Sequence, residues 1–143
     1  MIPLDDRTAE RLAKVIVDAD GPYERKSYEI ERLLANAGWS DPPQFDGFSR
    51  VQWLTEQLIE RKERGDEIER LLCRVCDPLE YDEKASADEF RKVVNTILEA
   101  EGLVISSTGG RPVVGALSAS GNPVFSAPED LERRLRLIHG LGK

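Results

Sequence analysis

Residues 86–117 read SADEFRKVVNTILEAEGLVISSTGGRPVVGAL, and this stretch decides the fold. Ser86 and Glu89 stand three positions apart ahead of an apolar run, which is the spacing of a capping box and predicts a helix that begins at Ser86. The apolar residues of this run share one helical face: Phe90, Val93, Val94, Ile97 and Leu98. Gly102 follows at a position typical of a left-handed helix cap. The stretch therefore opens with an amphipathic helix whose apolar face belongs to a core.

The second half of the stretch has the pattern of a β-hairpin. Residues 103–105 are a leucine, a valine and an isoleucine, which are β-formers able to begin a strand directly after the glycine cap. Gly109 and Gly110 can both adopt positive φ in a tight turn. Pro112 then opens the return strand, where its missing N–H is tolerated. The helix is thus expected to lead directly into a small antiparallel sheet.

Capping residues and apolar periodicity predict further helices on both sides of this stretch. We expect four before it and one after it, over about 5–19, 23–37, 49–65, 66–77 and 128–140. The predicted fold class is mainly α with a small β-hairpin (α+β), and its helix–hairpin unit resembles a winged helix. We predict one domain over 1–143, in which a helical part, 1–78, precedes a helix–hairpin–helix part, 79–143.

The charge of the chain is uneven. The 143 residues carry a net charge of −7, but residues 1–101 contain 15 basic and 24 acidic side chains, whereas residues 102–143 contain 5 and 3. A body with a net charge of −9 repels phosphate backbones and anionic lipid at long range. No apolar run approaches the roughly 20 residues that span a bilayer, and the N-terminus has no signal-peptide pattern. We therefore expect a cytoplasmic protein that does not contact membranes.

Few residues have the pattern of a catalytic or metal site. Cys73 and Cys76 form a C-x-x-C motif, yet no second pair and no flanking histidine completes a zinc site. The motif also lies late in a predicted helix, whereas a redox pair favours a helix N-terminus. The single histidine, His139, ends the last predicted helix, where it suits the final carbonyls. We predict that the chain is not an enzyme and holds no metal or cofactor.

Two groups of residues are candidates for binding a protein partner. One group lies in a proline-containing segment that cannot be helical: Trp39, Phe45 and Phe48. Aromatic side chains in such a segment either anchor an interface or fold back onto the core. The other group flanks the last predicted helix: Arg133, Arg134 and Arg136. We favour a non-catalytic module that binds a protein partner or self-associates through these residues.

The alternative function is that of a winged-helix DNA-binding transcriptional regulator. In this interpretation the helix after Ser86 is the recognition helix and the hairpin is the wing. Arg91, Lys92 and Asn95 would contact base edges, and Arg111 would contact a phosphate. Acidic residues bracket the proposed recognition face, and this charge disfavours DNA. Nucleic acid is a partner only in this alternative.

A set of apolar and turn residues within 68–117 forms a further pattern: Leu71-Leu72, Arg74, Val75, Asp77-Pro78, Glu80-Tyr81, Phe90, Val94-Asn95, Leu98, Glu101-Gly102-Leu103 and Gly110-Arg111-Pro112. This pattern resembles a small accessory domain that recurs beside effector domains in bacterial defence proteins of the abortive-infection type. The resemblance implies a sensing or docking part, with the toxic chemistry in a neighbouring domain, and it assigns no active-site residue. It therefore implies an adaptor or accessory role in anti-phage defence.

Overall fold

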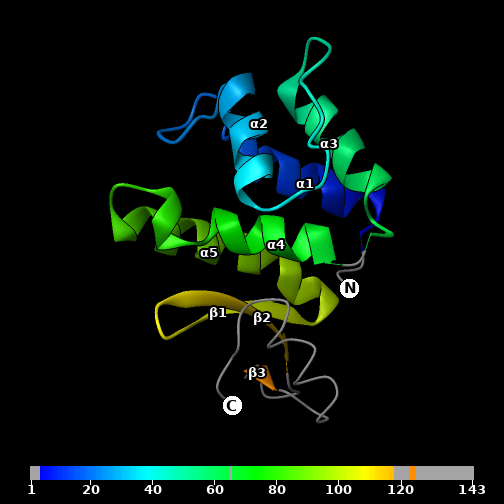
Figure 1. The fold of residues 1–143 in the computed structure, drawn as a ribbon. Helices are drawn as coiled ribbons and strands as arrows, with labels where there is room; N and C mark the ends of the chain where they lie inside the picture. Colours follow the sequence, from blue (N-terminus) through cyan, green and yellow to red (C-terminus); the bar gives the residue numbers. More distant parts are fainter. Residues whose placement is uncertain (1–3, 65, 118–122, 125–143) are drawn as a thin grey trace. The chain divides into compact units, whose positions relative to one another are not determined.

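The computed structural model describes residues 4–64, 66–117 and 123–124, which are coloured by sequence in Figure 1. The elements in these ranges are α1 (Asp6–Val17), α2 (Ser27–Asn36), α3 (Arg50–Glu60), α4 (Asp66–Val75), the 3-10 helices η1 (Pro78–Glu80) and η2 (Glu99–Glu101), α5 (Lys84–Leu98), β1 (Leu103–Thr108), β2 (Arg111–Leu117) and β3 (Pro123–Val124). The fold is therefore mainly helical with a small antiparallel sheet, and this confirms the predicted α+β class.

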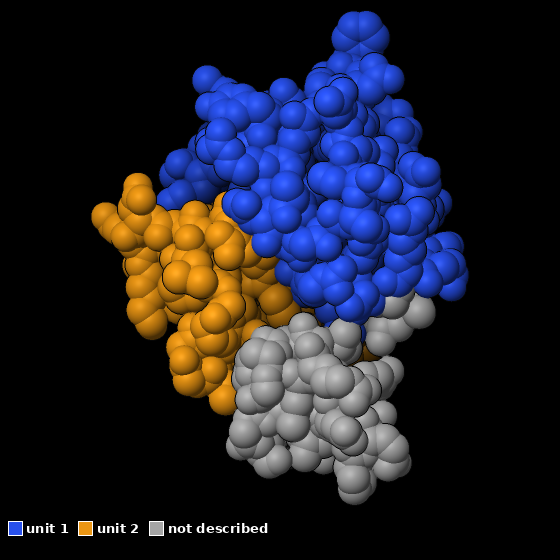
Figure 2. Space-filling view, in the orientation of Figure 1, with its two compact units in different colours: residues 1–71 blue, residues 72–143 orange. Residues whose placement is uncertain are grey.

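The chain divides into two compact units, 1–71 and 72–143, which Figure 2 shows in different colours. The boundary falls inside α4, so this helix contributes residues to both units. The predicted helix over 128–140, with Arg133, Arg134, Arg136 and His139, lies outside the described residues. Within the described part of the chain, no helix has the length and hydropathy needed to cross a membrane.

Unit 1 is a helical unit in which α1 and α3 pack against each other. Helix α1 begins as predicted, because the Asp5 carboxylate accepts a hydrogen bond from the Thr8 N–H over 2.7 Å. The largest fully buried side chains of unit 1 are aliphatic: Leu12, Ile16, Ile30, Leu33, Leu34, Leu54, Leu58, Ile68 and Leu71. The apolar periodicity of these helices therefore gives the core of unit 1, as the sequence predicts.

Helix α2 begins at Ser27, later than the predicted start near Tyr23. The Tyr23 N–H donates to the Asp18 carboxylate over 3.0 Å, and the Arg25 N–H donates to the Val17 carbonyl over 2.9 Å. These two bonds hold residues 18–25 in turns, so the helix begins only after them. Ala37 is the C-cap of this helix, and Gly38 follows it with a φ of 86°, in the left-handed conformation that glycine favours after a helix.

Unit 2 contains α5, and the prediction that this helix begins at Ser86 is wrong. Glu83 is the N-cap residue, and the Ser86 N–H donates to the Glu83 carbonyl over 3.1 Å. Because Lys84 and Ala85 are good helix formers, the helix extends toward the N-terminus and buries Ser86 in its first turn. The apolar face is also narrower than predicted, since Val93 is 47% exposed.

The hairpin of unit 2 has the predicted strands and turn. Strands β1 and β2 pair antiparallel in a register that joins Leu103 to Ala116 and Thr108 to Arg111. Gly109 and Gly110 form the turn with φ values of 60° and 81°. Strand β3 adds to β2, so the strand order is β1-β2-β3, and α5 packs against β1.

Candidate functional site

Trp39 belongs to the core of unit 1 and is only 4% exposed. Its indole Nε1–H donates to the Glu67 carbonyl over 2.9 Å, and the guanidinium of Arg61 lies over the ring at 4.4 Å from the centroid. Of the two roles that the sequence leaves open for this aromatic, the structure shows the fold-back onto the core.

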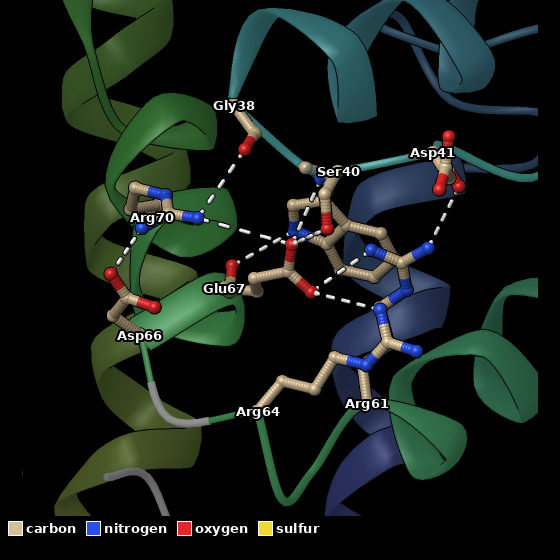
Figure 3. Close-up of polar contacts among 9 residues, drawn as sticks. Gly38, Ser40, Asp41, Arg61, Arg64, Asp66, Glu67 and Arg70 are labelled. Atoms are coloured by element: carbon tan, nitrogen blue, oxygen red, sulfur yellow. Dashed lines mark hydrogen bonds and ion pairs between the residues drawn. The ribbon is translucent and has the colours of Figure 1, made fainter.

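Trp39 contacts a buried charge network, and Figure 3 shows the polar contacts among Ser40, Asp41, Arg61 and Glu67. The Glu67 carboxylate accepts hydrogen bonds from Arg61 Nη1 over 2.9 Å and from the N–H and hydroxyl of Ser40 over 2.9 and 3.1 Å. Arg61 also donates to the Asp41 carbonyl over 2.9 Å. The Arg61 and Glu67 side chains are 9% and 6% exposed. We call Trp39, Ser40, Asp41, Arg61 and Glu67 the Glu67 network; it fixes residues 39–41 to the helical core.

The titration of Glu67 reflects this network. Burial raises the pKa of Glu67, but hydrogen bonds from Ser40 and Arg61, together with the charge of Arg61, lower it further than burial raises it. The pKa of Glu67 therefore lies below its ordinary value of 4.5. The contacts in the folded state therefore favour the ionised form of the Glu67 carboxylate.

We expect the Glu67 carboxylate to make the free energy of unfolding decrease at acidic pH. Because the folded-state pKa of Glu67 is lowered, its stabilisation is fully present above about pH 5 and is lost as pH falls through the folded-state value. Urea unfolding measured between about pH 7 and about pH 3 should show a smaller decline for Glu67→Gln than for the unmodified chain. Parallel pH profiles for the two proteins would contradict this expectation.

Phe45 and Phe48 lie in different environments. Phe45 is half-buried, and its ring meets Trp53 edge-on with 5.5 Å between the centroids. Its N–H donates to the Glu31 carboxylate. Phe48 is 108% exposed, so its ring lies wholly in solvent. Of the three aromatics predicted to anchor a partner, Phe48 is therefore the one presented to solvent.

Residues 40–49, which we call the Phe48 loop, are held at both ends. The Glu67 network holds the first end. At the other end, Ser49 caps α3 by accepting from the Gln52 N–H over 3.1 Å. Arg50 donates to the Arg25 carbonyl and to the Glu24 carboxylate, each over 2.7 Å. The chain between α2 and α3 projects as a loop beyond the start of α3 in Figure 1.

Two adjoining hollows, both open to solvent, lie beside the Phe48 loop. The first has a volume of about 200 Å³ and is lined by Asp46, Gly47, Phe48, Ser49, Gln52, Trp53 and Glu56. The second has a volume of about 480 Å³ and is lined by Asp6, Glu10, Ser49, Val51, Gln52, Thr55, Glu56 and Ile59. The hollows share Ser49, Gln52 and Glu56, so we treat them as one surface and call it the α1–α3 surface.

Three of the four residues proposed to contact DNA in the alternative interpretation have structural partners in unit 2. Asn95 donates to the Ile105 carbonyl over 2.9 Å and accepts from the Ile105 N–H over 2.7 Å. Arg91 pairs with Asp88 over 3.3 Å, and Arg111 pairs with Asp77 over 3.2 Å. Among the described residues, nothing pairs with the ammonium of the fourth, Lys92, which is exposed.

The two cysteines lie at the C-terminal end of α4. Cys76 is buried and Cys73 is half-buried. A redox pair favours a helix N-terminus, which is the opposite end of a helix. In the part of the chain that the structure describes, no three His, Cys, Asp or Glu side chains gather as metal ligands.

Compared with protein-family models, with curated proteins and with solved structures, the chain gives no significant match. The geometry of the described residues is therefore the basis for the functional proposal.

Proposed function

We propose that the chain is a non-catalytic module that binds a protein partner, with Phe48 as its principal anchor. The observation that carries this proposal is a wholly exposed phenylalanine on a loop fixed at both ends. A large aromatic ring in solvent gains free energy when a partner covers it. Because the two ends of the loop are already fixed, binding costs less conformational entropy than it costs for a loop without such contacts.

The resemblance of residues 68–117 to an abortive-infection accessory domain supports a role for this module in bacterial anti-phage defence, as an adaptor or accessory domain in the cytoplasm. Two cysteines are too few for a disulfide framework, and this number suits a reducing compartment. The partner can also be a second copy of the chain, since a second copy can cover the ring of Phe48.

The test compares two exposed aromatics of unit 1. We expect Phe48→Ser to weaken association with a purified partner at least tenfold, because it removes the ring that the partner buries. Tyr28→Ser is the matched control, since Tyr28 is 54% exposed on α2 and lies outside the Phe48 loop. The partner is a protein recovered by co-purification from the host; affinity is then measured between the two purified proteins, and self-association by sedimentation.

Both variants should keep the thermal stability of the unmodified chain, because neither ring is buried. Equal affinity of Phe48→Ser and the unmodified chain for every partner and for self-association would overturn the proposal. If the chain protects its host from phage, Phe48→Ser should also reduce that protection, whereas Tyr28→Ser should retain it.

A DNA-binding regulator is the second candidate. The succession of α5, β1 and β2 with a two-residue glycine turn favours it, and Arg111 near the turn is half exposed at 52%. The Asn95 amide, however, is used in holding Ile105, and Arg91 is paired with a carboxylate. We therefore rank this function below partner binding.

A further inference from the structure

We propose that the α1–α3 surface, with Phe48 at its end, binds a basic amphipathic segment of a protein partner. This inference rests on the proposed function and adds the chemistry of the partner.

The charges that line the α1–α3 surface are all negative: Asp6, Glu10, Asp46 and Glu56. Glu10 pairs with Arg7 and Lys14 along α1, over 3.0 and 3.7 Å. Among the described residues, no cation pairs with Asp6, Asp46 or Glu56. Because unpaired carboxylates on one face create a negative potential, this face attracts a cationic partner and repels an anionic one.

The apolar part of the surface follows α3. Val51, Thr55 and Ile59 recur every four residues, so they lie on one side of the helix and form a strip about 12 Å long. Thr55 contributes its methyl group to this strip, because its hydroxyl donates to the Val51 carbonyl. All three are half-buried. Phe48 precedes the N-cap of this helix and extends the apolar surface at that end.

An apolar strip edged by carboxylates matches a segment that presents apolar side chains on one side and lysine or arginine beside them. In such a complex, the apolar side chains contact the strip and the ring of Phe48, and the basic side chains lie next to Asp46 and Glu56. Nonpolar contact provides affinity, and the charges select the partner.

The test uses two short fluorescein-labelled peptides that differ only in charge. The first alternates leucine pairs with arginine at helical spacing, and the second has glutamate in place of every arginine. Fluorescence anisotropy at low and at high salt gives the affinity for the full chain. We expect the basic peptide to bind at least tenfold more tightly than the acidic one, with weaker binding at high salt.

Three variants locate the site. Phe48→Ser and Glu56→Lys should each weaken binding of the basic peptide at least fivefold. Glu60→Lys is the matched control, because it makes the same charge change at an exposed position of α3 outside the surface; its effect should stay below twofold. Equal effects of Glu56→Lys and Glu60→Lys would mean that the peptide is attracted by the overall negative charge and not by this surface, and this outcome would overturn the inference.

The outcomes also separate this inference from the proposed function. If Phe48→Ser abolishes capture of the purified partner while the basic peptide binds no better than the acidic one, partner binding stands and the basic chemistry is overturned. If Glu56→Lys dissociates a dimer of the chain and leaves peptide binding unchanged, a second copy is the occupant and the inference fails. If Phe48→Ser changes neither binding measurement, both proposals fail.

Discussion

Glu67→Gln should lower the free energy of unfolding by about 3 kcal/mol at neutral pH. The substitution keeps the shape of the side chain but removes its charge, and it leaves the 9% exposed guanidinium of Arg61 without its carboxylate. Breaking a buried ion pair on one side costs more than the pair itself contributes, because the remaining charge is desolvated without compensation. One carboxylate oxygen also accepts both hydrogen bonds from Ser40, and an amide accepts them more weakly.

Urea unfolding followed by tryptophan fluorescence measures this loss, since Trp39 lies within the Glu67 network. Glu63→Gln is the control, because Glu63 is exposed and neutralising it should change stability by less than about 0.5 kcal/mol. A loss for Glu67→Gln that is no larger than for Glu63→Gln would mean that Arg61 is accommodated without this carboxylate. The pair would then have no structural role.

The sequence predicts much of the fold because its signals are local. A carboxylate or hydroxyl three residues before a backbone N–H identifies the caps at Asp5 and Ser49, and two glycines identify the hairpin turn. The same locality explains the errors. Several consecutive residues before Phe90 are able to begin a helix, so the capping-box pattern at Ser86 does not determine the first residue of α5.

The site depends on contacts between residues distant in sequence, and these leave little local signal. A tryptophan beside a proline-rich segment is equally consistent with an anchor and a core residue. The buried indole of Trp39 donates to the carbonyl of Glu67, which lies 28 residues later in the chain. Arg61 and Glu67 lie on either side of a turn, without the spacing of an ion pair on one helix, so sequence reasoning missed the Glu67 network. Composition and proline content identified Phe48 as a candidate but gave no means of distinguishing it from Phe45.

Asn95→Ala should lower the stability of unit 2 by about 2 kcal/mol. The Asn95 side chain satisfies both backbone groups of Ile105, donating to its carbonyl over 2.9 Å and accepting from its N–H over 2.7 Å. Ile105 is 1% exposed, so its backbone groups are poorly placed to find water when the amide is removed. Alanine is the better helix former, which offsets the loss by about 0.5 kcal/mol.

Amide hydrogen exchange gives the sharpest measurement, because the Ile105 N–H loses its acceptor in the variant. We expect its exchange to become at least tenfold faster, while that of the amides inside α5 changes less. Thr96→Ala is the control on the same helix, since the Thr96 hydroxyl donates to the Lys92 carbonyl of its own helix at an exposed position. If Asn95→Ala instead left exchange unchanged and abolished binding to a DNA duplex, Asn95 would be a recognition residue. Its two bonds to Ile105 make the opposite result the expected one: a residue that holds β1 against α5 is not free to contact a base.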